Sequence, residues 1–306
     1  MDATPSVALP RDADRGIPAH PPAPMRIGKR LFAWGERTYL MCIVNVTPDS
    51  FSGDGLLADG ASSVVDRAVE QAVRMVDDGA DLIDVGGQST RPGHADIPVD
   101  DEIGRSVPVI RAIREALPDV PISIDTTRAD VAVAAIEAGA DLVNDVWGVA
   151  AEDRLLALAA ERKLPVVLMH NRAQARYANV VAEVIADLSR ALDRALASGI
   201  DWEMTIVDPG IGFGKTAEQN IAVLHDLALL RVLGRPMLLG TSRKSTIGKV
   251  LDLGPDQRVE GTMATTALGV AAGADIIRVH DMLPNARVAR MADAIVRGGW
   301  SEEASR

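Results

Sequence analysis

The chain has 306 residues, a length typical of one large α/β domain or two small ones. Its net charge of −11 argues against nucleic-acid binding as the main role, because a phosphate backbone attracts a basic surface. No run approaches the roughly 18 apolar residues that a membrane span requires, so we expect no membrane partner. A small anionic substrate remains compatible with this charge, since a local basic pocket can form in an acidic protein.

Residues 1–24 are rich in Pro and Ala and lack the basic start and apolar block of a secretory signal peptide. We interpret them as a disordered tail and expect a cytoplasmic location. No internal linker or shift in composition follows residue 30. The sequence therefore predicts one folded domain over residues 25–300 and a short tail over residues 301–306.

Eight short apolar runs recur along the chain, and each has the character of a buried strand. They lie near residues 40–46, 81–86, 121–125, 141–146, 165–170, 204–208, 236–241 and 275–280. Helical spacing predicts helices near 62–78, 130–138, 153–162, 180–198, 217–233 and 260–272. Eight strand–helix units over roughly 260 residues favour an α/β chain folded as a (β/α)8 TIM barrel. A doubly wound open sheet is the alternative.

The phrase Gly-Ala-Asp occurs three times, each time where a predicted helix gives way to a strand. The copies begin at Gly79, Gly139 and Gly273. A glycine there supplies the left-handed turn that ends a helix. The aspartates stand at strand starts, away from the end of a barrel that carries the active site, so we expect structural roles. They are Asp81, Asp141 and Asp275.

Polar residues stand near the end of most predicted strands, on one face of each. Side chains along a strand alternate faces, and the active site of a barrel lies at the carboxyl ends of its strands. A single such residue marks an exit to solvent, but six strands that share the feature favour a polar pocket. A cation inside a barrel requires a partner, so Arg278 is expected to meet an anion or an aspartate. The set is Asn45, Asp84, Ser123, Asp125, Asn144, Asp208, Arg278 and His280.

Three loops contain residues that suit ligand binding. Residues 86–93 combine glycines with Thr90 and Arg91, which can bind an anion, and residues 240–245 place Arg243 beside Lys244. For both, an ordinary surface turn is the alternative. Residues 208–216 end in Gly-Lys-Thr but are not a nucleotide-binding P-loop, because Pro209 stands where that motif requires glycine.

Taken together, these segments resemble the dihydropteroate synthase family from about residue 38 to 290. The resemblance rests on NVTPDSFS, DVGGQSTRPG, SIDTTRADV, LVNDVWG, VVLMH, DPGIGFGKT, GTSRKS and IIRVHD, in that order. It implies a transferase of folate biosynthesis that joins 6-hydroxymethyl-7,8-dihydropterin pyrophosphate to p-aminobenzoate and releases pyrophosphate. It also implies Mg²⁺ as cofactor, a homodimer, and inhibition by sulfonamides.

The resemblance assigns the candidate residues to three parts of one site. The pterin would be bound by Asp125, Asn144, Met169, Asp208, Phe213 and Lys244. The pyrophosphate would be bound by Asn45, Thr90, Arg91, Arg278 and His280, with Mg²⁺ at Asn45. The aminobenzoate pocket would contain Phe51, Pro92, Ser242 and Arg243. Catalytic roles would fall to Asn45, Asp125, Lys244 and Arg278. The arylamine is the nucleophile, so no nucleophile from the protein is needed.

The sequence departs from the family pattern at three places. Residues 53–55 are Gly-Asp-Gly after Phe51-Ser52, Gln88 replaces a common Glu, and Thr127-Arg128 replaces a common Ser-Lys pair. The first departure leaves a catalytically silent pterin-binding paralogue as an alternative. A methyltetrahydrofolate-dependent methyltransferase is another alternative, but it would need no pyrophosphate site.

Overall fold

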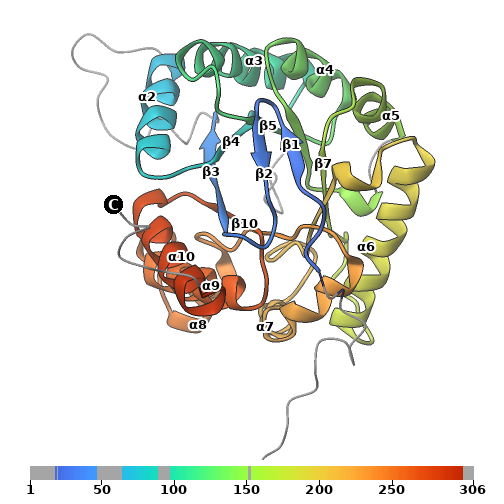
Figure 1. Cartoon of the computed structure of the whole chain (residues 1–306), viewed down its shortest axis with the longest axis vertical. Coiled ribbons are helices and arrows are strands. Elements are labelled where there is room, and N and C mark those ends of the chain that lie inside the picture. Colours follow the sequence, from blue (N-terminus) through green and yellow to red (C-terminus); the bar gives the residue numbers. More distant parts are fainter. Residues whose placement is uncertain (1–17, 19, 47–63, 89–96, 151–152, 299–306) are drawn as a thin grey trace, which may run out of the picture.

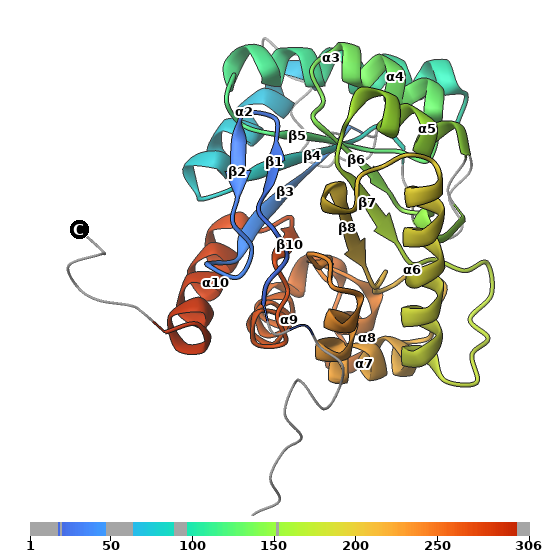
Figure 2. The ribbon, with the colours of Figure 1, turned by 45° about the vertical axis from the view of Figure 1, so that its right-hand side comes forward.

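Eight parallel strands form a closed barrel at the centre of the molecule (Figures 1 and 2). The computed structural model describes residue 18 and residues 20–46, 64–88, 97–150 and 153–298. The strands are β3 (Tyr39–Asn45), β4 (Leu82–Gly86), β5 (Ile122–Asp125), β6 (Leu142–Asp145), β7 (Val166–Met169), β8 (Thr205–Asp208), β9 (Leu238–Leu239) and β10 (Ile276–Val279). They pair in the order β8-β7-β6-β5-β4-β3-β10-β9. A parallel bridge between Val207 and Met237 joins the two ends. The predicted barrel is confirmed, and the alternative prediction of a doubly wound open sheet is wrong.

Helices surround the strands (Figure 1). They are α2 (Val64–Asp77), α3 (Val99–Ala116), α4 (Ala129–Glu137), α5 (Asp153–Arg162), α6 (Val180–Ala197), α7 (Ala217–His225), α8 (Ser245–Leu251), α9 (Val259–Ala271) and α10 (Met282–Val296). Each long helix packs an apolar stripe inward, as α6 does with Val184, Leu188 and Ala195. In the part of the chain that the structure describes, no helix is both long and apolar enough to cross a membrane.

The helix predicted over residues 217–233 divides into two pieces. α7 ends at His225, and residues Leu227–Leu233 form a 3-10 helix. Leu227, Leu230 and Leu233 are buried at a spacing of three, which matches the three residues per turn of a 3-10 helix. The other predicted helices correspond to α2, α4, α5, α6 and α9, while α3, α8 and α10 complete the ring.

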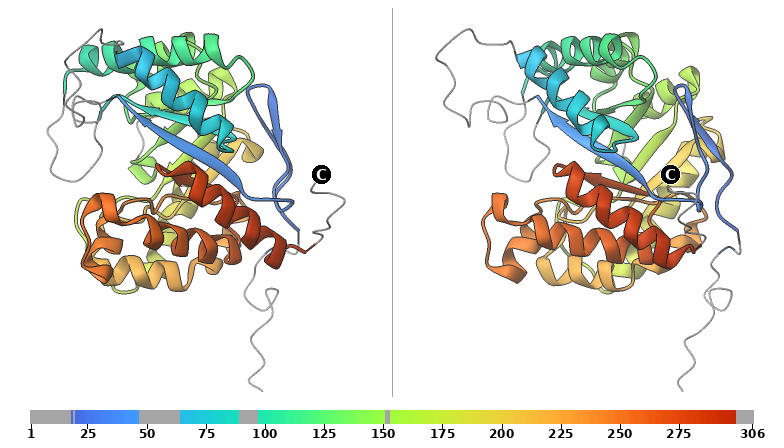
Figure 3. Two further views of the ribbon diagram at one scale, coloured as in Figure 1. Left: turned by 90° about the vertical axis from the view of Figure 1, so that its left-hand side faces the viewer. Right: turned by 60° about the vertical axis from the view of Figure 1, so that its left-hand side comes forward.

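A β-hairpin, which the sequence analysis did not predict, covers the end of the barrel where the strands begin (Figure 3). Its strands are β1 (Met25–Ile27) and β2 (Arg30–Phe32). Met25, Ile27 and Phe32 are at most 2% exposed and join the lowest inward-facing layer of the barrel. That layer consists of Met41, Leu82, Leu142, Val167, Ile206, Leu238 and Ile276. This apolar plug closes one end, so a ligand site is possible only at the other end. The tails predicted over residues 1–24 and 301–306 fall largely outside the described residues and stay predictions.

The three Gly-Ala-Asp copies adopt one geometry, with φ of 110°, 115° and 93° at their glycines. Each aspartate forms a reciprocal pair with a residue at the start of the preceding strand. Its N–H donates to that residue's carbonyl, and its carboxylate accepts that residue's N–H, over 2.7–2.9 Å. The predicted structural role is therefore confirmed. The pairs are Asp81 with Leu40, Asp141 with Ile122, and Asp275 with Met237.

We expect Asp141→Ala to lower the free energy of unfolding by about 1–3 kcal/mol, because it leaves the buried Ile122 N–H without a partner. The variant also loses the ion pair with Arg114, in which both side chains are less than a quarter exposed. Urea unfolding measures the loss. Asp119→Ala is the control, since its pair with Lys29 is exposed and should contribute little. Equal losses in the two variants would contradict a specific role for the reciprocal pair.

Candidate active site

A pocket opens at the carboxyl end of the barrel, opposite the hairpin. It encloses ≈ 290 Å³, counting its open mouth. Its lining is Asn144, Val146, Met169, Asp208, Ile211, Phe213, Gly240, Lys244 and Arg278. The polar strand ends therefore converge as the alternation of side chains predicts, and five of the six candidate pterin residues line one cavity.

An arginine held by two carboxylates forms the floor of this pocket. Nε of Arg278 donates to Asp84 Oδ2 at 2.6 Å, and Nη2 lies 2.7 Å from Asp125 Oδ2. Asn144 Nδ2 also donates to Asp84 Oδ2, at 3.1 Å. Burial alone would lower the pKa of Arg278, but Asp84 and Asp125 outweigh it and raise the pKa. The expectation that Arg278 meets an anion or an aspartate is confirmed for the aspartates.

Several buried oxygen atoms in this layer have no hydrogen-bond partner within the described part of the chain. They are Oδ1 of Asp84, Oδ1 of Asp125 and Oγ of Ser123. Buried polar atoms are normally paired, so an unpaired group of them indicates a place for ligand donors or ordered water. Burial also raises the pKa of Asp125 to about 7, against the opposing effect of Arg278.

Asp208 lies where β8 meets the glycine-rich loop. Its Oδ1 accepts the Gly210 N–H at 2.7 Å, and the residue is 5% exposed. Burial raises the pKa of Asp208 to about 6, although the Gly210 N–H and Lys244 favour the charged form. Gly210 has a φ of 66°, and a Cβ there would come within 1.8 Å of the His170 carbonyl oxygen. Glycine is therefore required for packing at this turn.

The walls of the pocket are apolar. Val146, Met169 and Phe213 form a small buried cluster of their own. The Nζ atom of Lys244 lies 3.9 Å from the centroid of the Phe213 ring. A flat heteroaromatic ring can therefore pack against Met169 and Phe213 while its polar edge meets the carboxylates.

Ser242, Arg243 and His280 form a second group at the rim. Ser242 Oγ accepts the backbone N–H of His280 at 3.1 Å and lies 3.0 Å from its Nδ1. Burial, assisted by Arg278, lowers the pKa of His280 to about 3, so its ring is neutral. Arg243 donates to both oxygens of Asp281, at 2.6 and 3.1 Å, and these bonds raise the pKa of Arg243.

The loops after β3 and β4 contribute the remaining candidates. Phe51, Thr90, Arg91 and Pro92 lie outside the described residues, so their predicted roles stay predictions. Asn45 ends β3, and a Cβ added at Gly86 on β4 would lie 3.7 Å from its Oδ1. Asn45 thus stands at the mouth of the barrel, beside the start of the loop that carries Thr90 and Arg91.

Sequence reasoning missed several supporting residues. Asp281 fixes Arg243, and Glu102 on α3 anchors the loop after β5. Glu102 is 2% exposed and accepts Thr126 Oγ1 at 2.7 Å and Arg128 Nη1 at 3.0 Å. The departure at Thr127-Arg128 is thus accommodated by this buried carboxylate. Asp84 was noted at its strand end, but the pairing with Arg278 that gives it a role was not predicted.

Comparison with known proteins agrees with this geometry. A family model described as "Pterin binding enzyme" matches residues 41–280. Dihydropteroate synthase of Clostridium beijerinckii is 49% identical over 274 residues, 89% of this chain and 100% of that protein. A Clostridium difficile dihydropteroate synthase structure, determined in the presence of pteroic acid, has a TM-score of 0.82 and 47% identity, covering 87% of this chain and 99% of that one.

A second similar structure was determined with a different ligand. The Xanthomonas albilineans dihydropteroate synthase with 4-aminobenzoic acid has a TM-score of 0.83 and 38% identity, covering 90% of this chain and 98% of that one. The likeness therefore extends over the whole barrel in both sequence and structure. The chain belongs to the pterin-binding enzyme family, within its dihydropteroate synthase group.

Proposed function

We infer that this enzyme makes 7,8-dihydropteroate from 6-hydroxymethyl-7,8-dihydropterin pyrophosphate and p-aminobenzoate, as a transferase of folate biosynthesis. The observation that carries the inference is the pocket, in which apolar walls adjoin Asp208, whose pKa is raised, and Arg278, which pairs with Asp125 beneath. Sulfonamides, as mimics of p-aminobenzoate, are expected to compete for the same site. A silent paralogue or a methyltransferase would share the pterin pocket, but the relatives named above favour the synthase.

The pterin is proposed to bind with its amide and amino edge toward the floor of the pocket. A carboxylate can accept hydrogen bonds from a ring N–H and an amino group, and Asp208 and the unpaired Oδ1 of Asp125 are the proposed acceptors. Asn144 and Lys244 supply further polar contacts along the same edge. Met169 and Phe213, which line the pocket, would supply the apolar contacts of the ring.

In the reaction, the arylamine nitrogen attacks the methylene carbon of the pterin, the carbon–oxygen bond breaks, and pyrophosphate departs with the electron pair. The nitrogen then loses a proton to solvent. Protein donors that face the leaving group stabilise its developing charge. His280 suits this role as a neutral donor. The backbone N–H of His280 donates to Ser242 Oγ, and the serine hydroxyl can in turn donate to Nδ1 of the ring. The ring hydrogen then lies on Nε2, where it can donate to a phosphate oxygen.

Mg²⁺ is proposed to bind with the pyrophosphate at Asn45. Within the described ranges, no three His, Cys, Asp or Glu side chains gather to hold a metal. Mg²⁺ commonly uses one or two protein oxygens and completes its shell with water and substrate phosphates. The amide oxygen of Asn45, at the barrel mouth, fits that requirement. The ion would supply positive charge to the leaving group.

A homodimer through α8, α9 and α10 is also proposed, as is a cytoplasmic location on the family resemblance. Four large apolar side chains on these neighbouring helices are 61–70% exposed, more than any other large apolar residue that the structure describes. Such a group marks an interaction surface. A second copy is the occupant that the family resemblance favours. The side chains are Val250, Leu268, Met291 and Ile295.

We expect the purified protein to form dihydropteroate from the two substrates when Mg²⁺ is present. Removal of the ion with EDTA should abolish turnover, and a sulfonamide should raise the KM for p-aminobenzoate. Product is measured by chromatography after incubation at saturating substrates. An enzyme that binds the pterin but forms no product under these conditions would be a silent paralogue.

We expect pterin affinity to fall about tenfold per pH unit below the pKa of Asp208, near 6, because the protonated acid loses an acceptor. Calorimetric titration between pH 5 and 8 measures this. Asp208→Asn should bind weakly throughout and lose the step near pH 6, so that only a step near the pKa of Asp125, about 7, remains. Asp130→Asn on α4, whose ion pair is exposed, is the control.

The same carboxyl affects folding in the opposite direction. A raised native pKa means that the folded state holds more protons than the unfolded state between about pH 4 and 6, so this contribution to stability is lost as the pH rises through that range. Asp208→Asn should therefore increase the free energy of unfolding at pH 8, by about 1–3 kcal/mol. Lower stability of this variant at pH 8 would contradict the burial cost.

We expect Ile295→Asp to convert a dimer into a monomer, because a charge in the centre of an apolar interface is costly to bury. Light scattering coupled to size-exclusion chromatography measures the mass. Leu31→Asp, an exposed apolar site on the hairpin at the other end of the barrel, is the matched control. An unchanged mass for the Ile295 variant would exclude this surface.

A further inference from the structure

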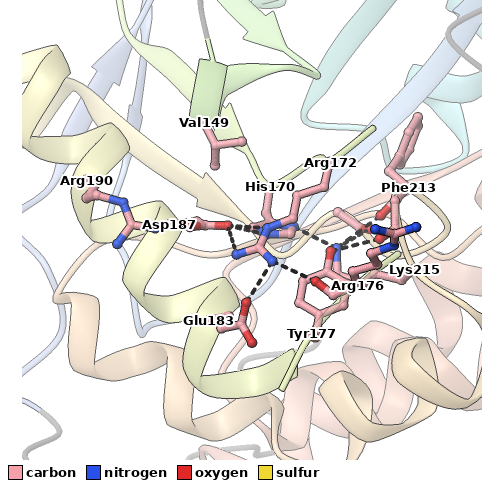
Figure 4. A network of polar contacts seen from close by, with 12 residues as sticks. Val149, His170, Arg172, Arg176, Tyr177, Glu183, Asp187, Arg190, Phe213 and Lys215 are labelled. Carbon is pink, nitrogen blue, oxygen red and sulfur yellow. Dashed lines mark hydrogen bonds and ion pairs between the residues drawn. The ribbon is translucent and has the colours of Figure 1, made fainter. Parts of the chain in front are cut away.

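We propose that Lys215 is a positioning residue for the pterin pocket. Lys215 and His170 together fix the loop after β8, and this loop aligns Asp208 and Phe213 (Figure 4). The proposal rests on the function inferred above. Lys215 is the lysine of the Gly-Lys-Thr sequence that fails as a phosphate loop, and neither the pterin site nor the pyrophosphate site uses it. Its side chain points back into the protein instead.

The ammonium group of Lys215 has three hydrogens, and three acceptor atoms surround it. Nζ donates to the carbonyl oxygens of Gly210 at 3.0 Å and Phe213 at 3.2 Å, and it lies 2.8 Å from Nδ1 of His170. All donors of a charged lysine are thus used. The two carbonyls belong to the turn that follows Asp208 and ends in Phe213, so one side chain ties both ends of that turn together.

The partners of His170 assign its tautomer. The ring is fully buried, and its Nε2 lies 3.0 Å from Oδ2 of Asp187. A carboxylate oxygen accepts, so Nε2 carries the hydrogen and Nδ1 remains an acceptor for Lys215. Burial, with the added effect of Lys215, lowers the pKa of His170 to about 4, in agreement with a neutral ring.

Asp187 connects this pair to the outer helix α6. Arg172 binds Oδ2 of Asp187 through Nε at 2.8 Å and also binds Glu183 at 2.7 Å. The guanidinium of Arg172 lies 4.5 Å from the centre of the Tyr177 ring, and the Tyr177 hydroxyl donates to the Gly214 carbonyl at 2.8 Å. The loop after β8 is therefore held by two attachments, one through Lys215 and one through Tyr177, and Figure 4 shows both side chains.

Two glycines let the loop lie directly on the segment after β7. An added Cβ at Gly210 would meet the His170 carbonyl oxygen at 1.8 Å, and one at Gly214 would meet the Arg172 carbonyl oxygen at 2.3 Å. The backbone contact leaves the Gly210 and Phe213 carbonyls facing inward. Without Lys215 the Phe213 carbonyl loses this donor, and the Gly210 carbonyl keeps only the Phe213 N–H at 3.1 Å, so the turn that presents Phe213 has reason to rearrange.

Burial lowers the pKa of Lys215 to about 7, although the charge of Asp208 acts in the opposite direction. Above that pH the amine keeps only two hydrogens, so one of its three contacts is lost. The attachment is therefore strongest below about pH 7 and weakens as the pH rises. The charged or titratable groups that face Lys215 are His170, Arg172, Asp187, Asp208 and Lys244.

The test compares Lys215→Met with Lys29→Met, which removes an exposed lysine at the other end of the barrel. For Lys215→Met we expect the Kd and KM of the pterin pyrophosphate to rise about tenfold, with kcat and the KM of p-aminobenzoate within about twofold. The Kd of the native enzyme should also increase between pH 7 and 9, and that alkaline change should be absent from the variant.

A pterin Kd equal to that of Lys29→Met, or equal losses for both substrates, would overturn the proposal. If Lys215→Met does not fold, Asp187→Asn tests the same connection, because it removes the charge that orients His170 and leaves Lys215 in place. We expect about a threefold, pterin-selective loss, and no change would overturn the proposal. Calorimetric binding needs no turnover, so an inactive native enzyme would refute the synthase function without deciding this test.

Discussion

The ion pair of Arg278 with Asp84 and Asp125 determines what the interior of this barrel can do. The three side chains come from β10, β4 and β5, and they meet at 2.6–2.7 Å in a layer that water barely reaches. Removal of one partner from a buried pair typically costs roughly 3–5 kcal/mol, because the other charge remains without compensation. The three strands must therefore keep their register, and the layer above the apolar plug must be polar.

The two ends of the barrel differ in how their polar groups are paired. At the start of the strands, the hairpin fills the interior with apolar side chains, and the aspartates of the Gly-Ala-Asp copies use both their backbone and side-chain groups on a neighbouring strand. At the other end, Oδ1 of Asp84 and of Asp125 have no hydrogen-bond partner among the residues that the structure describes. The carboxylates at the strand starts are therefore paired with backbone N–H groups, whereas those at the other end keep an acceptor oxygen to spare.

The strands and the polar strand ends could be predicted because they depend on local pattern. Period-two alternation carries Asn144, Asp208 and Arg278 to one face, and a barrel brings such faces together whatever the details of packing. The hairpin escaped prediction because strands of three residues are too short to show a period. The anchors Asp281, Glu102 and Lys215 escaped for another reason. Their bonds to Arg243, Thr126 and His170 span 38, 24 and 45 residues, and no local pattern reveals such a pairing.

The charges around the pocket suit a site that is completed by its substrate. Burial raises the pKa of Asp125 to about 7 and that of Asp208 to about 6, while it lowers that of His280 to about 3. In each case the protein lacks the water that would stabilise the charged form. In the proposed complex, N–H donors of the pterin edge would favour the ionised form of the carboxyls, and His280 would meet the pyrophosphate as a neutral donor. On this proposal, the free-energy cost of burying these groups without partners would be offset by the hydrogen bonds that the substrate brings.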